Sequence, residues 1–198
     1  LHALLRVPGV TAAVRLWEPE LLDISNLNRY LLMLRTMVGR PKVEMLEHWG
    51  HHGFHIVGHR ELVDESALAR IGPWASQVMV GTDNAEARLL VQRTWPAWLV
   101  VAGTAGFMAM VSEHEPGQPC AGCLHSWTEN VPGDVPTISF VSYWAGLLAA
   151  TRLLRRRLLG HVLRAEQVTV MWPDRLDSVT AFMPGPVPRM PGCRVGCI

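Results

Sequence analysis

The sequence predicts an α/β fold, a Rossmann-like, doubly wound domain with a mostly parallel sheet and helices on both faces. Two observations predict it. Short apolar runs typical of buried strands alternate with longer helical patterns through the first half of the chain. The composition is 49% hydrophobic and 18% charged over 198 residues, which is the balance of a globular chain long enough for one good-sized domain.

Glycine and proline divide the chain into its expected elements. Gly39 and Pro41 interrupt one long helical segment, so we expect two helices there, joined by a tight turn. Strands are expected at 14–16, 54–57, 77–80, 98–102, 103–111 (with glycine bends) and 167–171, and helices at 31–49, 65–71, 85–94 and 139–159. A loop is expected over 117–136 and a proline-rich tail over 184–191.

Charge and hydropathy exclude several classes of partner. The formal net charge of +1 provides no general attraction for nucleic acid or for an anionic membrane. The longest apolar run, Trp144–Ala150, is far shorter than the roughly 20 residues of a membrane span. The N-terminus carries no signal-peptide pattern. We therefore expect no nucleic acid, no membrane and a cytoplasmic location. The first residue is Leu1 rather than Met, and we expect the N-terminal part to be incomplete.

Four cysteines form two close pairs, Cys120 with Cys123 and Cys193 with Cys197. Two pairs far apart in the sequence suit a tetrahedral zinc site, because each pair supplies one knuckle and the metal joins distant segments. The second pair has three intervening residues where two are commoner. Disulfides or spare thiols are the alternative. We expect a zinc-bound C-terminal subregion.

A basic, amide-rich cluster follows the first expected strand. It consists of Ser25-Asn26-Leu27-Asn28-Arg29, with Lys42 thirteen residues after Arg29. The end of a strand is where an α/β protein usually receives a phosphorylated ligand, and this cluster has the donors for one. Solvated surface charges are the alternative for Arg29 and Lys42.

A second candidate site is Thr82-Asp83-Asn84, directly after the strand expected at 77–80. An aspartate at the carboxyl end of a strand can hold Mg²⁺, which would bridge phosphate oxygens. Asp and Asn are also favoured helix N-caps, and these three residues alone favour the cap.

The order of these motifs resembles the ThiF/MoeB superfamily, adenylyltransferases related to ubiquitin-activating enzymes, over nearly the whole chain. The motifs are Glu18-x-Glu20, Ser25-Asn26-Leu27-Asn28-Arg29, Val38-Gly39-x-Pro41-Lys42, Thr82-Asp83-Asn84 with Arg88, and the two cysteine pairs. The resemblance implies ATP-dependent adenylation of the C-terminal carboxylate of a ubiquitin-like or sulfur-carrier protein or of a peptide, with release of pyrophosphate. It also implies ATP, Mg²⁺ and Zn²⁺ as cofactors and a homodimer.

The resemblance assigns roles to individual residues. It implies catalytic roles for Arg29, Lys42 and Asp83. It implies that Glu18 binds the ribose, that Asn26 and Arg29 contact the phosphates, and that Ser25 and Asn28 line the pocket. It also implies Mg²⁺ at Asp83 with Asn84 beside it, and zinc at Cys120, Cys123, Cys193 and Cys197. It divides the single domain into a nucleotide-binding part, 1–112, and a zinc-knuckle and C-terminal part, 113–198.

The chain departs from the family pattern in places. Glu18 stands where Asp is usual, Tyr30 stands where Gln is common, and the Gly-x-Gly-x-x-Gly loop should precede Leu1, where we expect it. With all four cysteines assigned to zinc, we expect no thioester on this chain. One alternative is a catalytically inactive partner of such an adenylyltransferase, which loss of the glycine loop would favour. The other is an NAD- or FAD-dependent Rossmann oxidoreductase.

Overall fold

The computed structural model describes residues 1–71, 76–124, 139–160, 166–172, 182–193 and 195–197. Within them the chain divides into two compact units, an N-terminal unit of residues 1–71 and a C-terminal unit of residues 72–198. The expected division into a nucleotide-binding part, 1–112, and a zinc-knuckle and C-terminal part, 113–198, stays a prediction. The boundary between these two parts lies inside a strand of the C-terminal unit.

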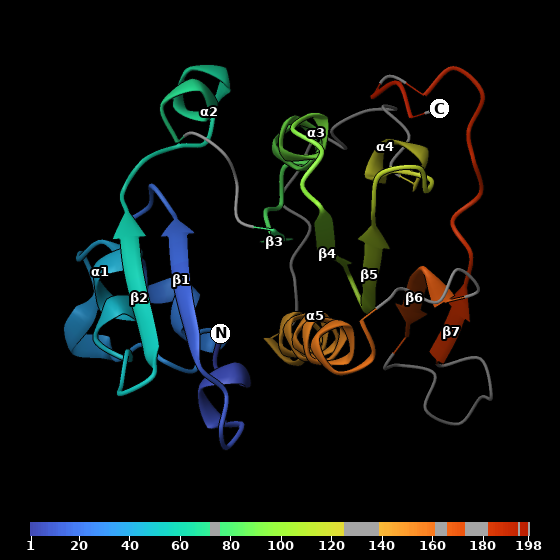
Figure 1. Ribbon diagram of the computed structural model, residues 1–198. Coiled ribbons are helices and arrows are strands. Elements are labelled where there is room, and N and C mark those ends of the chain that lie inside the picture. Colours follow the sequence, from blue (N-terminus) through green and yellow to red (C-terminus); the bar gives the residue numbers. More distant parts are fainter. Residues whose placement is uncertain (72–75, 125–138, 161–165, 173–181, 194, 198) are drawn as a thin grey trace. The chain divides into compact units, whose positions relative to one another are not determined.

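The N-terminal unit is built on two parallel strands, β1 (Ala12–Trp17) and β2 (Phe54–His59). They pair from Ala12 opposite Phe54 to Trp17 opposite His59, and Figure 1 shows their arrows pointing the same way. Parallel neighbours require a long crossover. Here it contains the 3-10 helices η2 (Ile24–Asn28) and η3 (Arg35–Met37) and the helix α1 (Lys42–Glu47), while η1 (Leu4–Arg6) precedes β1 and α2 (Glu65–Ile71) follows β2.

Of the two helices predicted within 31–49, the first does not form as an α-helix. Leu31 and Leu34, which share one face of the predicted helix, are both 60% exposed, whereas the adjacent Leu32 and Met33 are buried. The predicted apolar face is therefore not the buried one. The indole N–H of Trp49 donates to the carbonyl of Leu32 at 2.8 Å, which takes the place of an intrahelical bond. Only α1 forms from the predicted segment as an α-helix.

Helix α1 packs closely on β2 at Gly58. A Cβ at this position would lie 2.2 Å from Val43 Cγ2 and 3.1 Å from the Glu47 carboxyl carbon. The Gly58 N–H donates to Glu47 Oε1 at 2.5 Å. Because Lys42 is the first residue of α1, the contact at Gly58 also determines where Lys42 lies relative to the strands.

The C-terminal unit contains a five-stranded sheet in the order β3-β4-β5-β6-β7. The β3–β4 pair is parallel and the other three pairs are antiparallel. The elements are β3 (Gln77–Val80), α3 (Ala85–Arg93), β4 (Trp98–Ala105), β5 (Met108–His114), α4 (Ala121–Leu124), α5 (Ser139–Leu159), β6 (Val168–Met171) and β7 (Phe182–Gly185).

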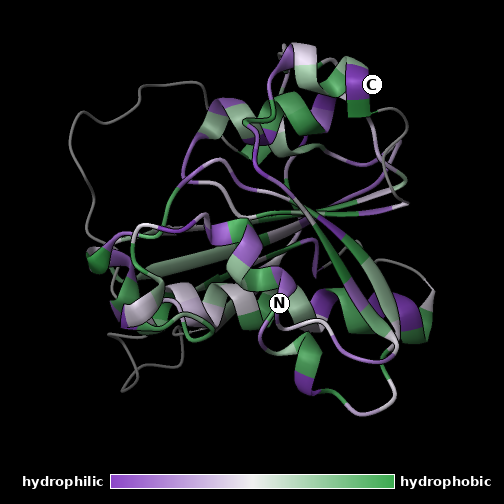
Figure 2. Ribbon diagram, turned by 90° about the vertical axis from the view of Figure 1, so that its left-hand side faces the viewer, coloured by the Kyte–Doolittle hydropathy of each residue, from purple (hydrophilic) through white to green (hydrophobic). Residues whose placement is uncertain are grey.

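Strand β4 is buried on both faces of this sheet. Trp98, Leu99, Val100 and Val101 are each at most 1% exposed, although successive side chains of a strand point to opposite faces. Trp98 and Val100 pack with Val111 and Ala149, so α5 covers their face. Figure 1 shows α5 on one side of the sheet and α3 and α4 on the other, and Figure 2 shows hydrophobic residues along the strands.

Charged residues of α5 pair with acids near the sheet. Arg152 Nη1 lies 3.2 Å from Glu113 Oε1, and both side chains are buried. Burial raises the pKa of Glu113, and the Arg152 charge opposes that rise. Arg155 pairs with Glu166 at 2.5 Å, and Arg156 pairs with Glu115. These pairs tie α5 to β5 and to the start of β6.

The predicted α/β fold is confirmed, with helices on both faces of the five-stranded sheet. The sequence also predicts a mixed sheet, and this sheet is mixed, with one parallel and three antiparallel pairs. The segment predicted as a strand with glycine bends is a hairpin, in which Gly106 has a φ of +54° between β4 and β5. Strand β7 was not expected, because prolines dominate the segment around it. Residues 125–136 of the predicted loop lie outside the described residues. Among the helices that the structure describes, none has the length and apolar character needed to cross a membrane.

Substituting Gly58→Ala should destabilise the N-terminal unit by about 1–3 kcal/mol, because the added methyl group overlaps Val43. Gly81→Ala is the control, since a Cβ there meets nothing within 4 Å. Urea unfolding of both variants provides the measurement. Equal stability of the two would contradict the close packing of α1 on β2.

Candidate functional site

Lys42 is the buried cation among the predicted phosphate-binding residues of the N-terminal unit. The Lys42 residue is only 3% exposed, and its ammonium group forms an ion pair with Glu20 Oε2. Its Nζ also lies 5.3 Å from the centre of the Tyr30 ring, a cation–π contact. The Lys42 N–H donates to the Glu20 carbonyl at 3.0 Å, so the two segments are joined by backbone as well.

Lys42 is positively charged at neutral pH. Burial acts to lower the pKa of its ammonium group, but the hydrogen bond to Glu20 and the nearby Tyr30 and Glu18 outweigh burial and raise it. The carboxyl of Glu20 is 66% exposed, and Glu18 Oε1 accepts the N–H of Glu20 at 3.0 Å. The site therefore presents one buried cation whose partner carboxylate lies mostly in water.

The cluster Ser25–Arg29 begins with a capped 3-10 helix. Asp23 Oδ1 accepts the Ser25 N–H at 2.8 Å, and Asn26 Oδ1 accepts the Asp23 N–H at 3.1 Å, a reciprocal capping box. The hydrogen bonds from Ser25 lower the pKa of Asp23. Asn26 is buried and its oxygen is committed to the cap, which leaves its amide N–H groups as the donors for a ligand.

Arg29 is the exposed cation of this cluster. Its Nη1 donates to Asn28 Oδ1 at 3.3 Å and to the Ser25 carbonyl at 3.4 Å, and all three residues are exposed. These long bonds orient the guanidinium without burying it. The structure thus places these residues in two sets of contacts of the N-terminal unit, Glu18, Glu20 and Lys42 in one and Ser25, Asn26, Asn28 and Arg29 in the other. Tyr30 joins the two sets, because its ring contacts Lys42 and its N–H donates to the Asn26 carbonyl at 3.2 Å.

Asp83 and Asn84 lie in the C-terminal unit, after β3. Asn84 is the N-cap of α3, and its Oδ1 accepts the N–H groups of Glu86 at 2.8 Å and Ala87 at 3.4 Å. The cap that these residues alone favoured is therefore present at Asn84. Asp83 is exposed. Burial of Arg88 lowers the pKa of its guanidinium group, and the negative charge of Asp83 partly offsets this effect.

Arg88 packs beneath this turn. Its Nε donates to the Thr82 carbonyl at 2.8 Å, and a Cβ at Gly103 of β4 would come within 3.0 Å of its Nη1. Gly103 therefore leaves room for the guanidinium, which braces the segment that carries Asp83. The roles of Asp83 and Asn84 toward a nucleotide stay predictions.

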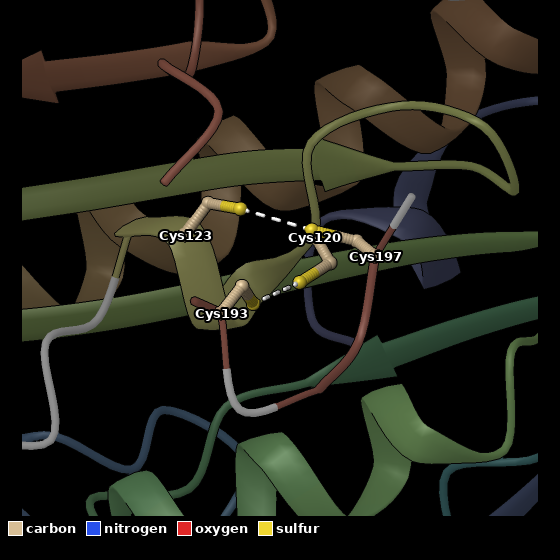
Figure 3. Close-up of side chains that lie close together, drawn as sticks. All are labelled: Cys120, Cys123, Cys193 and Cys197. Carbon is tan, nitrogen blue, oxygen red and sulfur yellow. Dashed lines mark hydrogen bonds between the residues drawn. The ribbon is translucent and has the colours of Figure 1, made fainter. Parts of the chain in front are cut away.

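The four cysteines converge, as the sequence predicts, and all are free thiols (Figure 3). Their sulfur atoms all lie within 4.8 Å of one another, with Cys120 and Cys193 at 3.3 Å and Cys123 and Cys197 at 3.1 Å. A tetrahedral Cys₄ zinc site with Zn–S bonds of about 2.3 Å places its sulfurs about 3.8 Å apart. The donor set and its spacing fit a metal ion.

Each cysteine pair has its own backbone turn. The Cys123 N–H donates to the Cys120 carbonyl at 2.9 Å, and the Gly196 N–H donates to the Cys193 carbonyl at 2.9 Å. Gly196 has a φ of +75°, a left-handed conformation that glycine adopts without strain. The extra residue of the second pair is thus accommodated by Gly196.

Gly122 is required where the two pairs meet. A Cβ there would lie 2.7 Å from Val195 Cγ2, 3.0 Å from Cys193 Sγ and 3.4 Å from Cys120 Sγ. The glycine therefore makes space for a cysteine from the far end of the chain. Its position inside the first Cys-x-x-Cys pair is the sequence signal of this close approach.

Burial and hydrogen bonding act in opposite directions on the thiols. Burial raises the pKa values of Cys120 and Cys123, which lie among apolar residues such as Val168 and Val187. Burial also acts to raise the pKa of Cys193, but the backbone N–H of Val195 and the neighbouring thiols lower it to about 7. Cys193 therefore ionises at lower pH than Cys120 and Cys123.

Comparison with known proteins shows the fold. No protein-family model matches the chain. Over 128 residues, 63% of the chain, it is 30% identical to an uncharacterized protein of Sinorhizobium fredii, y4jF, and it spans 25% of that relative. Because the chain covers only a quarter of this relative, the match does not assign a family.

Solved structures of the Escherichia coli protein MccB are similar over most of the chain. A complex of MccB with MccA-N7isoASN matches at a TM-score of 0.74 and 17% identity, covering 92% of this chain and 59% of MccB. The microcin C7 biosynthetic enzyme MccB with N-formylated MccA matches at 0.76 and 16%, covering 92% and 60%. PaaA matches at 0.63 and 14%, covering 90% and 57%. The chain has the ThiF/MoeB-like fold of MccB.

Substituting Gly122→Ala should weaken metal binding by the cysteine cluster at least tenfold, because the added methyl group displaces Val195 and Cys193. Titration with Co²⁺, followed by its thiolate absorption, measures the affinity. Gly146→Ala is the control, since a Cβ at this exposed helical position meets nothing within 4 Å. Unchanged Co²⁺ affinity in Gly122→Ala would contradict the close approach.

Metal affinity should rise with pH between about 6 and 8, because thiols must lose their protons to bind a metal. Burial keeps Cys120 and Cys123 protonated at neutral pH, and Cys193 changes charge near 7. The affinity should change by about tenfold per pH unit for each proton displaced. Co²⁺ titrations at several pH values, with proton release followed in weak buffer, measure this. An affinity independent of pH would oppose thiolate ligation.

Proposed function

We propose that this chain is the adenylating domain of a ThiF/MoeB-like enzyme, which uses ATP to activate the C-terminal carboxylate of a peptide or of a ubiquitin-like or sulfur-carrier protein. The observation that carries the proposal is the buried Lys42 ammonium group, held beside the capped Ser25–Arg29 cluster at the end of a parallel strand. The likeness to MccB, one of whose structures contains ATP and others MccA, supports it.

The reaction is transfer of an adenylyl group. A carboxylate oxygen of the substrate attacks the α-phosphorus of ATP, the bond from that phosphorus to the bridging oxygen breaks, and pyrophosphate leaves with both electrons. The product is an acyl-adenylate. Such a reaction needs positioning and charge neutralisation more than proton transfer.

Lys42 and Arg29 would supply the positive charge. Lys42 keeps its charge because Glu20 and Tyr30 hold its pKa high, and it is rigidly placed because its side chain is buried. The carboxyl of Glu20 is solvated, so a polyphosphate would displace it at low cost. Arg29 is exposed, and its guanidinium group would contact the phosphates from the solvent side.

The remaining site residues would bind and orient the nucleotide. Glu18 follows β1 directly and would accept hydrogen bonds from ribose hydroxyls. Asn26 would donate to phosphate through its amide, while Ser25 and Asn28 line the same surface. Asp83 would hold Mg²⁺, which would supply positive charge to neutralise the phosphates. Asn84 would keep the Asp83 segment in place as the cap of α3.

The cysteine cluster would bind zinc as a structural metal. Four thiolates in a closed tetrahedral set are typical of structural Zn²⁺, and no ligand position would remain open for substrate. The ion would join the α4 knuckle to the chain near Cys193 and Cys197. A homodimer and a cytoplasmic location accompany this proposal as predictions from the family resemblance.

The proposed activity is tested by ATP–pyrophosphate exchange with peptides or carrier proteins that end in a free carboxylate. Amidation of that carboxylate should abolish exchange. Lys42→Ala and Arg29→Ala should each lower the exchange rate by about 10²–10³-fold, because each removes a charge that stabilises the transition state. Asp83→Ala should lower it and raise the Mg²⁺ concentration required.

Arg35→Ala is the matched control, since Arg35 is also an exposed arginine of the same unit and lies outside the proposed site. It should retain the rate of the unaltered protein. Direct titration of each variant with ATP and Mg²⁺ separates binding from turnover. If the protein binds ATP but no carboxylate supports exchange, the adenylation proposal is wrong. Binding of NAD or FAD instead of ATP would contradict it as well.

A further inference from the structure

The first cysteine pair is held by buried polar side chains on both sides of Cys120. The Pro119 carbonyl, before Cys120, accepts a hydrogen bond from Gln167 Nε2 at 2.6 Å. The Ala121 N–H, after Cys120, donates to Gln92 Oε1 at 3.0 Å. Gln92 is 1% exposed and Gln167 is 2% exposed, so both amides are removed from water.

A buried histidine completes the contact to Pro119. His114 Nδ1 lies 2.9 Å from the Pro119 carbonyl, and because a carbonyl only accepts, Nδ1 carries the proton. Nε2 lies 2.8 Å from the Ser112 hydroxyl, from which it accepts when the ring is neutral. The network is thus fully oriented, with Ser112 donating to His114 and both His114 and Gln167 donating to Pro119.

These side chains come from separate, rigid parts of the C-terminal unit. Gln92 lies in the last turn of α3, His114 is the last residue of β5, and Gln167 directly precedes β6. The Gln167 carbonyl also accepts the Glu113 N–H at 2.8 Å, which continues the pairing of β5 with β6. The backbone around Cys120 is therefore fixed to the helix and to the sheet at the same time.

A buried amide left without its partner costs free energy, so these contacts hold the knuckle in one conformation. The second cysteine pair differs. Cys193 and Cys197 are only partly buried, and the hydrogen bonds described for their backbone are local, such as those of Cys193 with Met190 and Gly196. One half of the metal site is thus built into the sheet, and the other half lies on the C-terminal segment.

We propose that Gln92, Gln167 and His114 are positioning residues for the metal, which fix Cys120 before the metal binds. The proposal rests on metal binding by the four cysteines. Residues that orient a ligand through its backbone raise metal affinity because less ordering is required on binding. Cys193 and Cys197 then close on a half-site that already has its geometry.

The experiment compares Co²⁺ affinity and absorption spectrum across variants of the full chain, with Zn²⁺ competition as a second measure. Gln92→Met and Gln167→Met remove the hydrogen bonds at nearly constant side-chain volume, and each should weaken binding by about 10–100-fold. Gln118→Met is the matched control from the loop before Cys120, and it should bind Co²⁺ as the unaltered protein does.

A second pair of variants separates positioning from general loss of stability. Gln92→Glu keeps an oxygen that accepts the Ala121 N–H and should retain most of the affinity. Gln167→Glu loses the donor to Pro119 and should be as weak as Gln167→Met. Urea unfolding with and without Co²⁺ gives the free energy of unfolding that the metal adds. If the glutamines had a purely structural role, each variant would lose the same free energy of unfolding with and without Co²⁺.

The outcomes distinguish this inference from the proposed metal site. If the unaltered protein binds neither Co²⁺ nor Zn²⁺, both are wrong. If it binds Co²⁺ and all four glutamine variants keep its affinity and spectrum, the cysteines bind metal without positioning by Gln92 and Gln167. Equal losses in Gln92→Glu and Gln92→Met would also overturn the inference, because the accepting oxygen would then be irrelevant.

Discussion

Burial of β4 on both faces is the constraint on which the C-terminal unit depends. Its first four residues are almost completely removed from water, so a helix is needed on each side of the sheet. The parallel pairing of β4 with β3 determines where Thr82-Asp83-Asn84 emerges, and Gly103 of β4 makes room for the Arg88 side chain that supports this turn. The antiparallel pairing with β5 directs the chain toward the cysteine knuckle. Both proposed sites of this unit therefore depend on one buried strand.

Cations in the two units are placed by different means. Lys42 is buried, and its position follows from the packing of α1 on β2 at Gly58 and from its ion pair with the solvated Glu20. Arg29 stays exposed and is oriented only by long hydrogen bonds to its own segment. On α5, by contrast, Arg152 pairs with the buried Glu113 and ties the helix to the sheet. A buried charge held by one exposed partner is available to an anionic ligand, whereas a fully buried pair is not.

The cysteine cluster shows how a site can join rigid and less rigid parts of one unit. Cys120 lies between backbone groups held by Gln92 and Gln167, and Gly122 leaves the space into which Cys193 fits. The left-handed Gly196 lets a pair with three intervening residues turn as tightly as the first pair. Helix α3 begins at the Asn84 cap and contributes Gln92 near its other end, so the segment after β3 and the knuckle share one helix.

The sequence by itself determined the α/β class, the strands and helices with strong patterns and the convergence of the cysteines into one cluster. These follow from local periodicity, from glycine and proline punctuation and from motif order. Only the tertiary structure decided that residues 31–38 do not form an α-helix, since the Trp49 indole takes the Leu32 carbonyl. It also decided the order of the strands, the partner of Lys42 and the hydrogen bonds of Gln92, His114 and Gln167 around Cys120. A glutamine has no local signature of burial, because its partners lie on segments that only the fold brings together.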